Sequence, residues 1–116
     1  MTAEQLEKVR KISRFYGYET QTRQLAEEIG ELLQAMNKYW RKDLQCGKYM
    51  YNPWDGYMPE DSEEYWNLVE EIADMEIMLE QMKFFLAVRD NGFDRIVQEK
   101  LDRQIKRMEE EKNEDN

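Results

Sequence analysis

Two short acidic segments carry the residues of this sequence whose types and spacing could support chemistry. They are residues 25–32 (LAEEIGEL) and residues 68–75 (LVEEIADM), which begin 43 positions apart and share four of their eight residues. Each segment has two carboxylates three positions apart, Glu28 and Glu31 in the first and Glu71 and Asp74 in the second. Carboxylate oxygens are the protein ligands of hard divalent cations such as Mg²⁺. The pattern therefore predicts metal-dependent chemistry.

Helical periodicity places both carboxylate pairs beside apolar faces. Each residue of an α-helix advances about 100° around the axis. Three apolar residues of each segment then align into a stripe, namely Leu25, Ile29 and Leu32, and Leu68, Ile72 and Met75. The two pairs lie at the same edge of their stripes, so antiparallel packing of the helices would gather four carboxylates into one half-buried cluster. Such a cluster needs a bound cation because its like charges repel.

Composition limits the classes of protein to which the chain can belong. Its 116 residues suit one domain, and 26 acidic against 17 basic residues give a net charge of −9. This charge disfavours nonspecific binding to nucleic acid and to anionic membranes. The absence of histidine excludes His-ligated zinc sites and histidine general bases. A single cysteine, with no signal peptide or long apolar run, predicts a soluble cytoplasmic protein.

Few glycines and prolines, with many helix-forming residues, predict an all-α fold. We expect an antiparallel bundle of about four main helices. Thr2 and Gln5 have the spacing of a capping box that opens the first helix, and Gly17 ends it. Thr20 or Thr22 is then expected to cap the second helix, which carries the first acidic segment.

The third helix carries the second acidic segment and is expected to follow a cap at Asp61 or Ser62. Asn91-Gly92 is expected to end this helix, and a fourth helix then begins near Asp94. Residues 1–108 form the expected single domain. Residues 109–116 are too acidic and too poor in apolar side chains to pack, which predicts a disordered tail.

The expected fourth helix carries two basic residues, Lys100 and Arg103, which we call the basic edge. They lie beside the apolar face of this helix, as the carboxylate pairs do on the other two helices. Relative to Val97, Lys100 and Arg103 occupy the angles that Glu28 and Glu31 occupy relative to Leu25. Such residues could bind the far phosphates of a ligand whose near phosphates share Mg²⁺ with the carboxylates. The alternative is surface ion pairing four positions apart, Glu99 with Arg103 and Asp102 with Lys106.

The two acidic segments resemble motifs of a known family, and the resemblance covers about residues 20–107 of the chain. Glu27-Glu28-Ile29-Gly30-Glu31 and Glu71-Ile72-Ala73-Asp74 are similar to the Glu-Glu-x-x-Glu and Glu-x-x-Asp motifs of the all-α nucleoside triphosphate pyrophosphatases, the MazG-like proteins. The resemblance implies Mg²⁺ ligation, with Mn²⁺ as a substitute, by Glu28, Glu31, Glu71 and Asp74. It also implies cleavage of a ribo- or deoxyribonucleoside triphosphate between the α and β phosphates, giving the monophosphate and pyrophosphate.

The basic edge carries a second part of the resemblance. Lys100-Leu101-Asp102-Arg103 is similar to the downstream Lys-x-x-Arg motif of the family, which implies catalytic phosphate contacts by Lys100 and Arg103. The sequence departs from the family in two places. Gln98 stands where an asparagine is often found, and the segment between the acidic motifs is longer than usual.

That long segment, residues 43–61, lacks helical periodicity and interleaves turn formers with aromatic residues. Loops of this length in compact domains usually serve a function or are disordered. We expect aromatic rings in and beside it to stack on the nucleobase, with Trp40, Trp54 and Tyr57 as candidates. The alternative is a flap that only covers the core.

The sequence thus predicts a Mg²⁺-dependent nucleotide pyrophosphohydrolase. A homo-oligomer, dimer or tetramer, is expected because short helical pairs leave apolar residues such as Met78 and Phe84 to be covered. Two alternatives stay open. One is a related hydrolase that acts on another nucleotide, such as a phosphoribosyl-ATP, and the other is a non-catalytic helical scaffold or adaptor whose acidic edges are only solvated.

Overall fold

The fold is all-α, as the sequence predicts. A computed structural model describes residues 1–45, 62–88 and 90–114, and these ranges contain four α-helices, one short π-helix and no strand. The chain divides into two units, Met1–Phe85 and Leu86–Asn116, each described by itself. Among the described residues, no helix combines the length and the apolar character required to cross a bilayer.

The first helix, α1 (Ala3–Tyr16), begins and ends as predicted. The backbone N–H of Thr2 donates to Gln5 Oε1 at 2.8 Å, and the backbone N–H of Gln5 donates to Thr2 Oγ1 at 3.1 Å. These two bonds complete the capping box. Gly17 ends the helix with φ of 84°, a conformation that residues with a Cβ rarely adopt.

The second helix, α2 (Tyr18–Tyr39), starts directly after Gly17, so the predicted cap at Thr20 or Thr22 was wrong. Gly17 changes the direction of the chain within one residue, so no linker remains in which a capping side chain could stand. The Thr22 hydroxyl instead donates to the carbonyl oxygen of Tyr18 at 2.9 Å, inside the first turn. A π-helix, η1 (Trp40–Gln45), continues the helical path beyond α2.

The third helix, α3 (Glu63–Phe85), has the predicted cap at Ser62. The Tyr65 backbone N–H donates to Ser62 Oγ at 3.0 Å. The other predicted cap, Asp61, lies outside the described residues, as does most of the aromatic loop, residues 46–61.

The prediction that Asn91-Gly92 ends the third helix was wrong. Both residues lie in the first turn of α4 (Asp90–Glu114), which begins four residues before the expected start at Asp94. The left-handed backbone conformation between the helices is taken by Ala87, with φ of 53°. Residues 109–114 continue α4, and their side chains are exposed.

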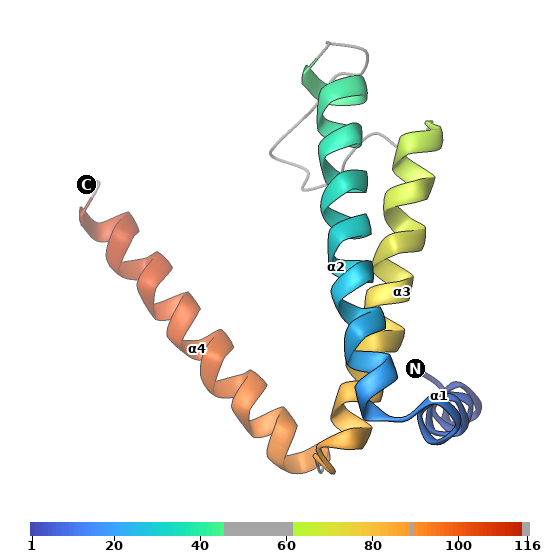
Figure 1. Cartoon of the computed structure of the whole chain (residues 1–116). Coiled ribbons are helices and arrows are strands. Elements are labelled where there is room, and N and C mark those ends of the chain that lie inside the picture. The colour runs from blue at the N-terminus through green and yellow to red at the C-terminus, as the bar shows by residue number, and fades with distance from the viewer. Residues whose placement is uncertain (46–61, 89, 115–116) are drawn as a thin grey trace. The chain divides into compact units, whose positions relative to one another are not determined.

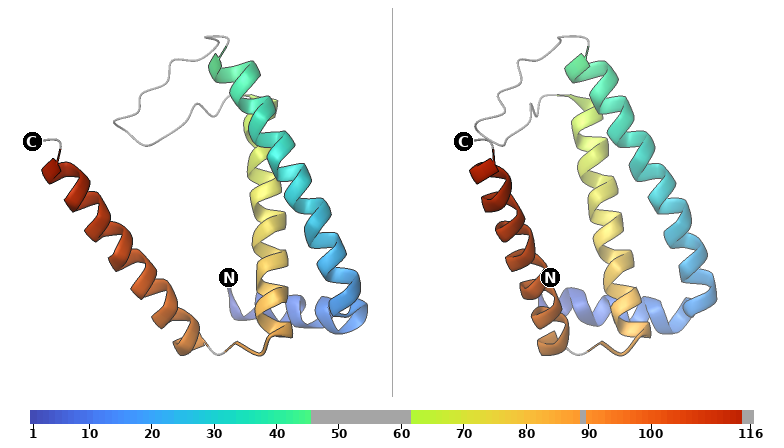
Figure 2. Two further views of the ribbon diagram at one scale, coloured as in Figure 1. Left: turned by 60° about the vertical axis from the view of Figure 1, so that its left-hand side comes forward. Right: turned by 90° about the vertical axis from the view of Figure 1, so that its left-hand side faces the viewer.

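Within the first unit, α2 and α3 lie side by side and run antiparallel (Figures 1 and 2). Ring contacts mark both ends of the pair, with centroids 5.6 Å apart for Tyr18 and Phe85 and 6.1 Å apart for Tyr39 and Tyr65. The first helix, α1, lies across the end of the pair where α2 begins, and it contacts both helices. Antiparallel packing is the arrangement that brings the two acidic segments level with each other.

The buried seam between α2 and α3 is rotated from the predicted stripes toward the carboxylates. Its buried members include Gln21, Ala35 and Tyr39 on α2 and Met78 and Gln81 on α3. Two predicted stripe residues, Ile29 and Ile72, are instead 44% and 51% exposed. Met36 and Leu79, seven residues further along the same faces, are 48% and 50% exposed. Two helices can cover only a narrow seam, so part of each wide stripe stays uncovered.

The expectation that Met78 lies at an oligomer interface was wrong. We expected its side chain to be apolar surface that a partner must cover, but it is only 5% exposed within the first unit. Phe84 is half-buried, with Arg14 over its ring at 5.3 Å from the centroid. The uncovered apolar surface of this unit therefore comes from other residues, among them Ile29 and Ile72 of the two stripes and Phe15 of α1.

Candidate metal centre

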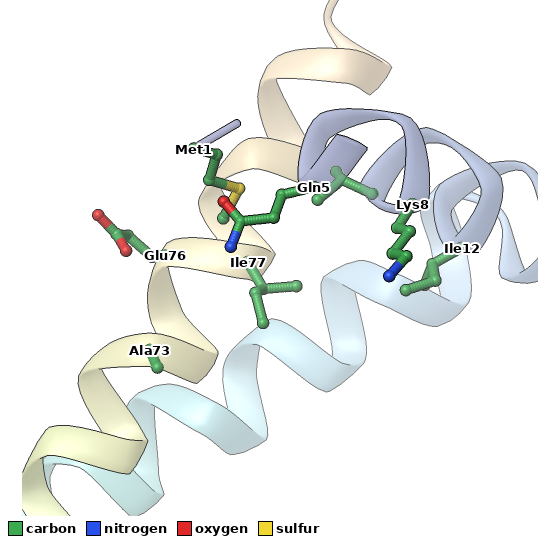
Figure 3. Close-up of a pocket in the computed structure, with 8 residues that line it drawn as sticks. Met1, Gln5, Lys8, Ile12, Ala73, Glu76 and Ile77 are labelled. Carbon is green, nitrogen blue, oxygen red and sulfur yellow. The ribbon is translucent and has the colours of Figure 1, made fainter. Parts of the chain in front are cut away.

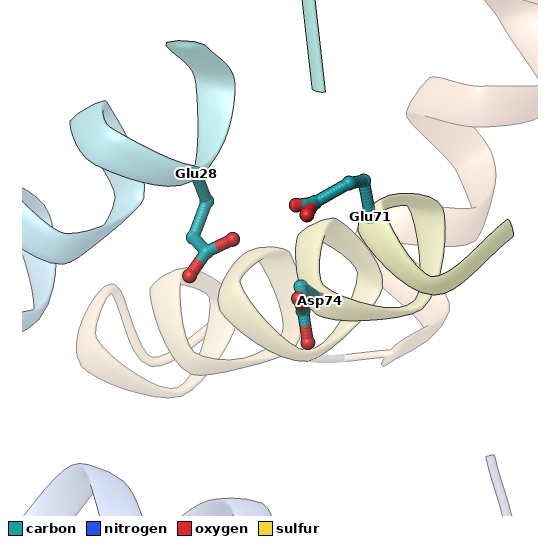
Figure 4. Close-up of side chains that lie close together, drawn as sticks. All are labelled: Glu28, Glu71 and Asp74. Atoms are coloured by element: carbon teal, nitrogen blue, oxygen red, sulfur yellow. The ribbon is translucent and has the colours of Figure 1, made fainter. Parts of the chain in front are cut away.

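Three of the four predicted carboxylates meet between α2 and α3. One carboxylate oxygen from each of Glu28, Glu71 and Asp74 lies within 4.8 Å of the other two (Figure 4). Glu28 comes from α2, and the other two come from successive turns of α3. The cluster forms because the acidic segments have the same helical phase and the helices are antiparallel.

Glu31, the fourth predicted residue, lies beside this cluster on the next turn of α2. Its side chain is exposed, and the negative charge of Glu28, followed by partial desolvation, raises its pKa above the ordinary value. The charge of Asp74 across the seam acts in the same direction. Glu31 is therefore coupled to the cluster electrostatically.

The two carboxyl groups of α3 also hold their protons more tightly than usual. Burial raises the pKa of Glu71, and the charges of Glu31 and Glu28 raise it further. Partial desolvation raises the pKa of Asp74, whose side chain is exposed, with a second contribution from the charge of Glu28. Among the described residues, no lysine or arginine forms an ion pair with any of these carboxylates.

Two oxygens of the cluster are buried without a hydrogen-bond partner, Glu28 Oε2 and Glu71 Oε2. Glu28 Oε1, in contrast, accepts a hydrogen bond from Gln24 Nε2 at 2.9 Å. A buried polar atom without a partner is costly, and for a carboxylate oxygen a bound cation would remove that cost. The donor set is all carboxylate oxygen, which suits Mg²⁺, Mn²⁺ or Ca²⁺ rather than a soft metal.

Gln24 is a site residue that the sequence analysis missed. It stands four positions before Glu28, a spacing at which helix side chains meet, so the sequence did contain the signal. Its amide binds one oxygen of the Glu28 carboxylate, and the second oxygen stays buried without a hydrogen-bond partner. Hydrogen bonds of this kind, from a residue that does not itself bind the metal, commonly orient metal ligands.

The predicted phosphate ligands, Lys100 and Arg103, lie in the second unit on α4, and both are exposed. The alternative ion pairs, Glu99 with Arg103 and Asp102 with Lys106, are not among those formed by the described residues. Arg95 instead approaches Glu99 at 4.0 Å, and Gln98 donates to Asp102 at 2.9 Å. Because each unit is described by itself, contact between the basic edge and the carboxylates stays a prediction.

The predicted base-binding rings are only partly within the described residues. Trp40 is the first residue of η1 and is 53% exposed, so its ring is accessible to a ligand. Trp54 and Tyr57 lie outside the described residues. Stacking of these rings on a base therefore stays a prediction.

A cavity of about 450 Å³ lies between α1 and α3 (Figure 3). Its lining is mostly apolar and includes Val9, Ile12 and Ile77, with Lys8 and Glu76 among its charged members. None of the residues that line this cavity is Glu28, Glu31, Glu71 or Asp74. The cavity is thus separate from the candidate metal centre.

No protein-family model, curated protein or solved structure matches the chain. Its function is therefore argued from the carboxylate cluster and its surroundings.

Proposed function

We propose that this protein is a Mg²⁺-dependent nucleotide pyrophosphohydrolase that cleaves a nucleoside triphosphate between the α and β phosphates. One observation carries the proposal: carboxylates from two antiparallel helices converge within 4.8 Å, and two of their oxygens are buried without a partner. A cation satisfies those oxygens, and a Mg²⁺ ion in such a site is usually shared with substrate phosphates. The resemblance of both acidic segments to the MazG-like motifs supports the same reading.

Each region of the chain has a defined task in this proposal. Glu28, Glu71 and Asp74 hold the cation, and Glu31 provides a further carboxylate at the solvent side. Bound Mg²⁺ would neutralise phosphate charge and favour deprotonation of the attacking water. Lys100 and Arg103 bind the departing phosphates, whose charge increases as the α–β bond breaks. Trp40 and the rings of the aromatic loop stack on the base.

The assembly that we propose is a homo-oligomer, a dimer or tetramer, in the cytoplasm. Support comes from the uncovered halves of the α2 and α3 stripes, where Ile29, Met36, Ile72 and Leu79 are all about half exposed. Contiguous exposed apolar surface of this kind usually marks an interface. The net charge of −9 makes a nucleotide carried with Mg²⁺ a more suitable partner than nucleic acid.

A second candidate is a non-catalytic helical scaffold or adaptor. It is favoured by α4, where every side chain of residues 91–114 except Phe93 is exposed. Its apolar residues, among them Val97, Leu101 and Ile105, are thus available to a partner. In this reading the acidic cluster is only a solvated edge.

The two candidates separate in an assay of pyrophosphate release from a panel of nucleoside triphosphates, with and without Mg²⁺. The enzyme proposal predicts release that requires Mg²⁺ and disappears in Asp74→Asn. Glu70→Gln serves as the matched control, because Glu70 is exposed and this change removes the same charge from the same acidic segment. A folded protein that releases pyrophosphate from no nucleotide, with Mg²⁺ or Mn²⁺, would favour the scaffold.

A further inference from the structure

A pair of buried amides joins α2 to α3 at a distance from the carboxylates. Gln21 Nε2 donates a hydrogen bond to Gln81 Oε1 at 2.8 Å. The two side chains are 6% and 1% exposed, and Gln81 is the largest side chain that is fully buried within the described residues. Buried amides are uncommon in a small helical core, because each must find a hydrogen-bond partner away from water.

The amide pair is in the same helical register as the cation site. Gln21 precedes Glu28 by seven residues, and Gln81 follows Asp74 by seven. Seven residues make about two turns of helix, so Gln21 and Glu28 lie on one line along α2. Gln81 and Asp74 lie on the corresponding line of α3. Any sliding of one helix along the other therefore shifts both pairs together.

Apolar contacts alone would tolerate such sliding, whereas the amide pair does not. If α3 moved by one heptad, Gln81 would stand opposite Glu28, and Asp74 would stand opposite Ala35. The carboxylates would no longer meet, and the Gln21 amide would be buried without its partner, which is costly. Buried polar residues at single seam positions are known to fix the register of packed helices in this way.

We propose that Gln21 and Gln81 form a register lock that holds Glu28 opposite Glu71 and Asp74. They are positioning residues, since they act through the helices and do not touch the carboxylates. The inference rests on the proposed function only in taking the cluster to be a cation site. The lock itself is a statement about α2 and α3, and it can be tested without any ligand.

The decisive variant replaces both amides, Gln21→Leu together with Gln81→Leu. Leucine has a similar volume and leaves no buried amide unpaired, so the melting temperature should stay equal or rise. Affinity for Mn²⁺, measured by electron paramagnetic resonance on the full chain, should fall at least tenfold. A loss of metal affinity in a protein that is no less stable distinguishes positioning from a merely structural role.

Register is read directly from the distance between two spin labels. Cysteines placed at the exposed positions Arg23 on α2 and Asn67 on α3, with Cys46→Ser, carry the labels. With both glutamines present, pulsed dipolar spectroscopy should give one distance. The double leucine variant should add a second population, displaced by one heptad, which is about 10 Å along the helix axis.

Ser13→Ala is the matched control for the loss of a buried hydrogen bond. Ser13 is fully buried like Gln81, but its hydroxyl donates at 2.8 Å to the Val9 carbonyl oxygen in its own helix. This variant should keep one spin-label distance and the Mn²⁺ affinity of the unchanged protein.

The outcomes keep the two proposals apart. A double leucine variant with a single, unchanged distance and unchanged Mn²⁺ affinity would overturn the lock. If the unchanged protein binds no Mn²⁺, the metal site fails, and the spin-label distances alone decide the lock. A second distance in the double leucine variant would then still support it, and a single distance would overturn it.

Discussion

The α2–α3 pair and α4 use similar residues in opposite ways. All three helices are long and rich in charge, with 22, 23 and 25 residues. Between α2 and α3, carboxylates face one another and two of their oxygens are buried without a partner. On α4, charged groups lie in solvent, and the ion pair that its described residues form, Arg95 with Glu99, lies along the helix itself.

The comparison shows that position rather than amount of charge identifies a candidate site. An exposed ion pair is worth only about 0–1 kcal/mol, because water already solvates both groups. A carboxylate oxygen that is buried beside other carboxylates without a hydrogen-bond partner carries a desolvation cost that nothing offsets. The same residue types therefore indicate a ligand in the first region and a solvated surface in the second.

The largest effect should come from the carboxylate that α2 contributes to the cluster. Glu28→Gln should lower pyrophosphohydrolase activity by more than about 100-fold, because even groups that only orient a metal ligand contribute 10- to 100-fold. Glu27→Gln, one position away and exposed, should change activity little. Steady-state kinetics measures both variants. Equal losses would mean that burial beside the seam does not separate functional from solvated carboxylates.

The next effect tests whether α4 is more than a solvated helix. Arg103→Ala should lower kcat by about 100-fold if the guanidinium binds phosphate charge in the transition state. Arg103→Lys keeps the charge but loses the bidentate geometry, so it should recover only part of that loss. Mg²⁺ stabilisation of the free protein should survive both changes. Full turnover in Arg103→Ala would mean that Arg103 does not bind phosphate and that the charges of α4 are only solvated.

A smaller effect is expected on the metal-free protein as the pH changes. Folding raises the pKa of Glu71 above the ordinary value of 4.5, so the folded state binds its proton more tightly than the unfolded state. The resulting stability is fully present below pH 4.5 and is lost as the pH rises through the raised pKa. Melting temperature should therefore fall as the pH rises above 4.5.

Glu71→Gln should flatten this pH dependence and raise the metal-free melting temperature at pH 7 by a few degrees. Glu76→Gln removes the same charge from an exposed position of α3 and controls for the net charge of −9. Thermal melts over the pH series, followed by circular dichroism, measure both. Identical curves for the two variants would show that the carboxylates of the cluster repel one another no more than exposed carboxylates do.

The smallest effect belongs to the ion pair on α4. Arg95 and Glu99 are both mostly exposed at a separation of 4.0 Å. Arg95→Gln should change the free energy of unfolding by at most about 0.5 kcal/mol, measured by urea denaturation, and this small change should disappear in high salt. A loss several times larger would mean that the charges of α4 are not simply solvated.

Features encoded by neighbouring residues could be predicted from the sequence. The Thr2–Gln5 capping box and the Ser62 cap depend on contacts three residues apart, and both are present. Repetition of the acidic segment in one helical phase was enough to predict that its carboxylates gather. The two caps need no knowledge of how the rest of the chain packs, and the gathering of the carboxylates needs only the antiparallel packing of α2 and α3.

Features that depend on a choice between competing packings could not be predicted. Asn91-Gly92 has the composition of a helix end, but Ala87 takes the left-handed conformation, and α4 has already begun at Asp90. The seam between α2 and α3 is rotated toward the carboxylates because two helices cover less than the full apolar stripes. The Gln21–Gln81 pair is found only once that rotation is known.

The central claim is that the cluster of Glu28, Glu71 and Asp74 is a divalent cation site, and thermal melting against Mg²⁺ concentration tests it most directly. A ligand that binds only the folded state stabilises it by about 2.7 kcal/mol at one hundred times its dissociation constant. Melting temperature should therefore rise steadily as Mg²⁺ increases from zero to the millimolar range. The double variant Glu28→Gln with Asp74→Asn should show no such rise. An unchanged melting curve of the unaltered protein across this range, with Mg²⁺ and with Mn²⁺, would contradict the account.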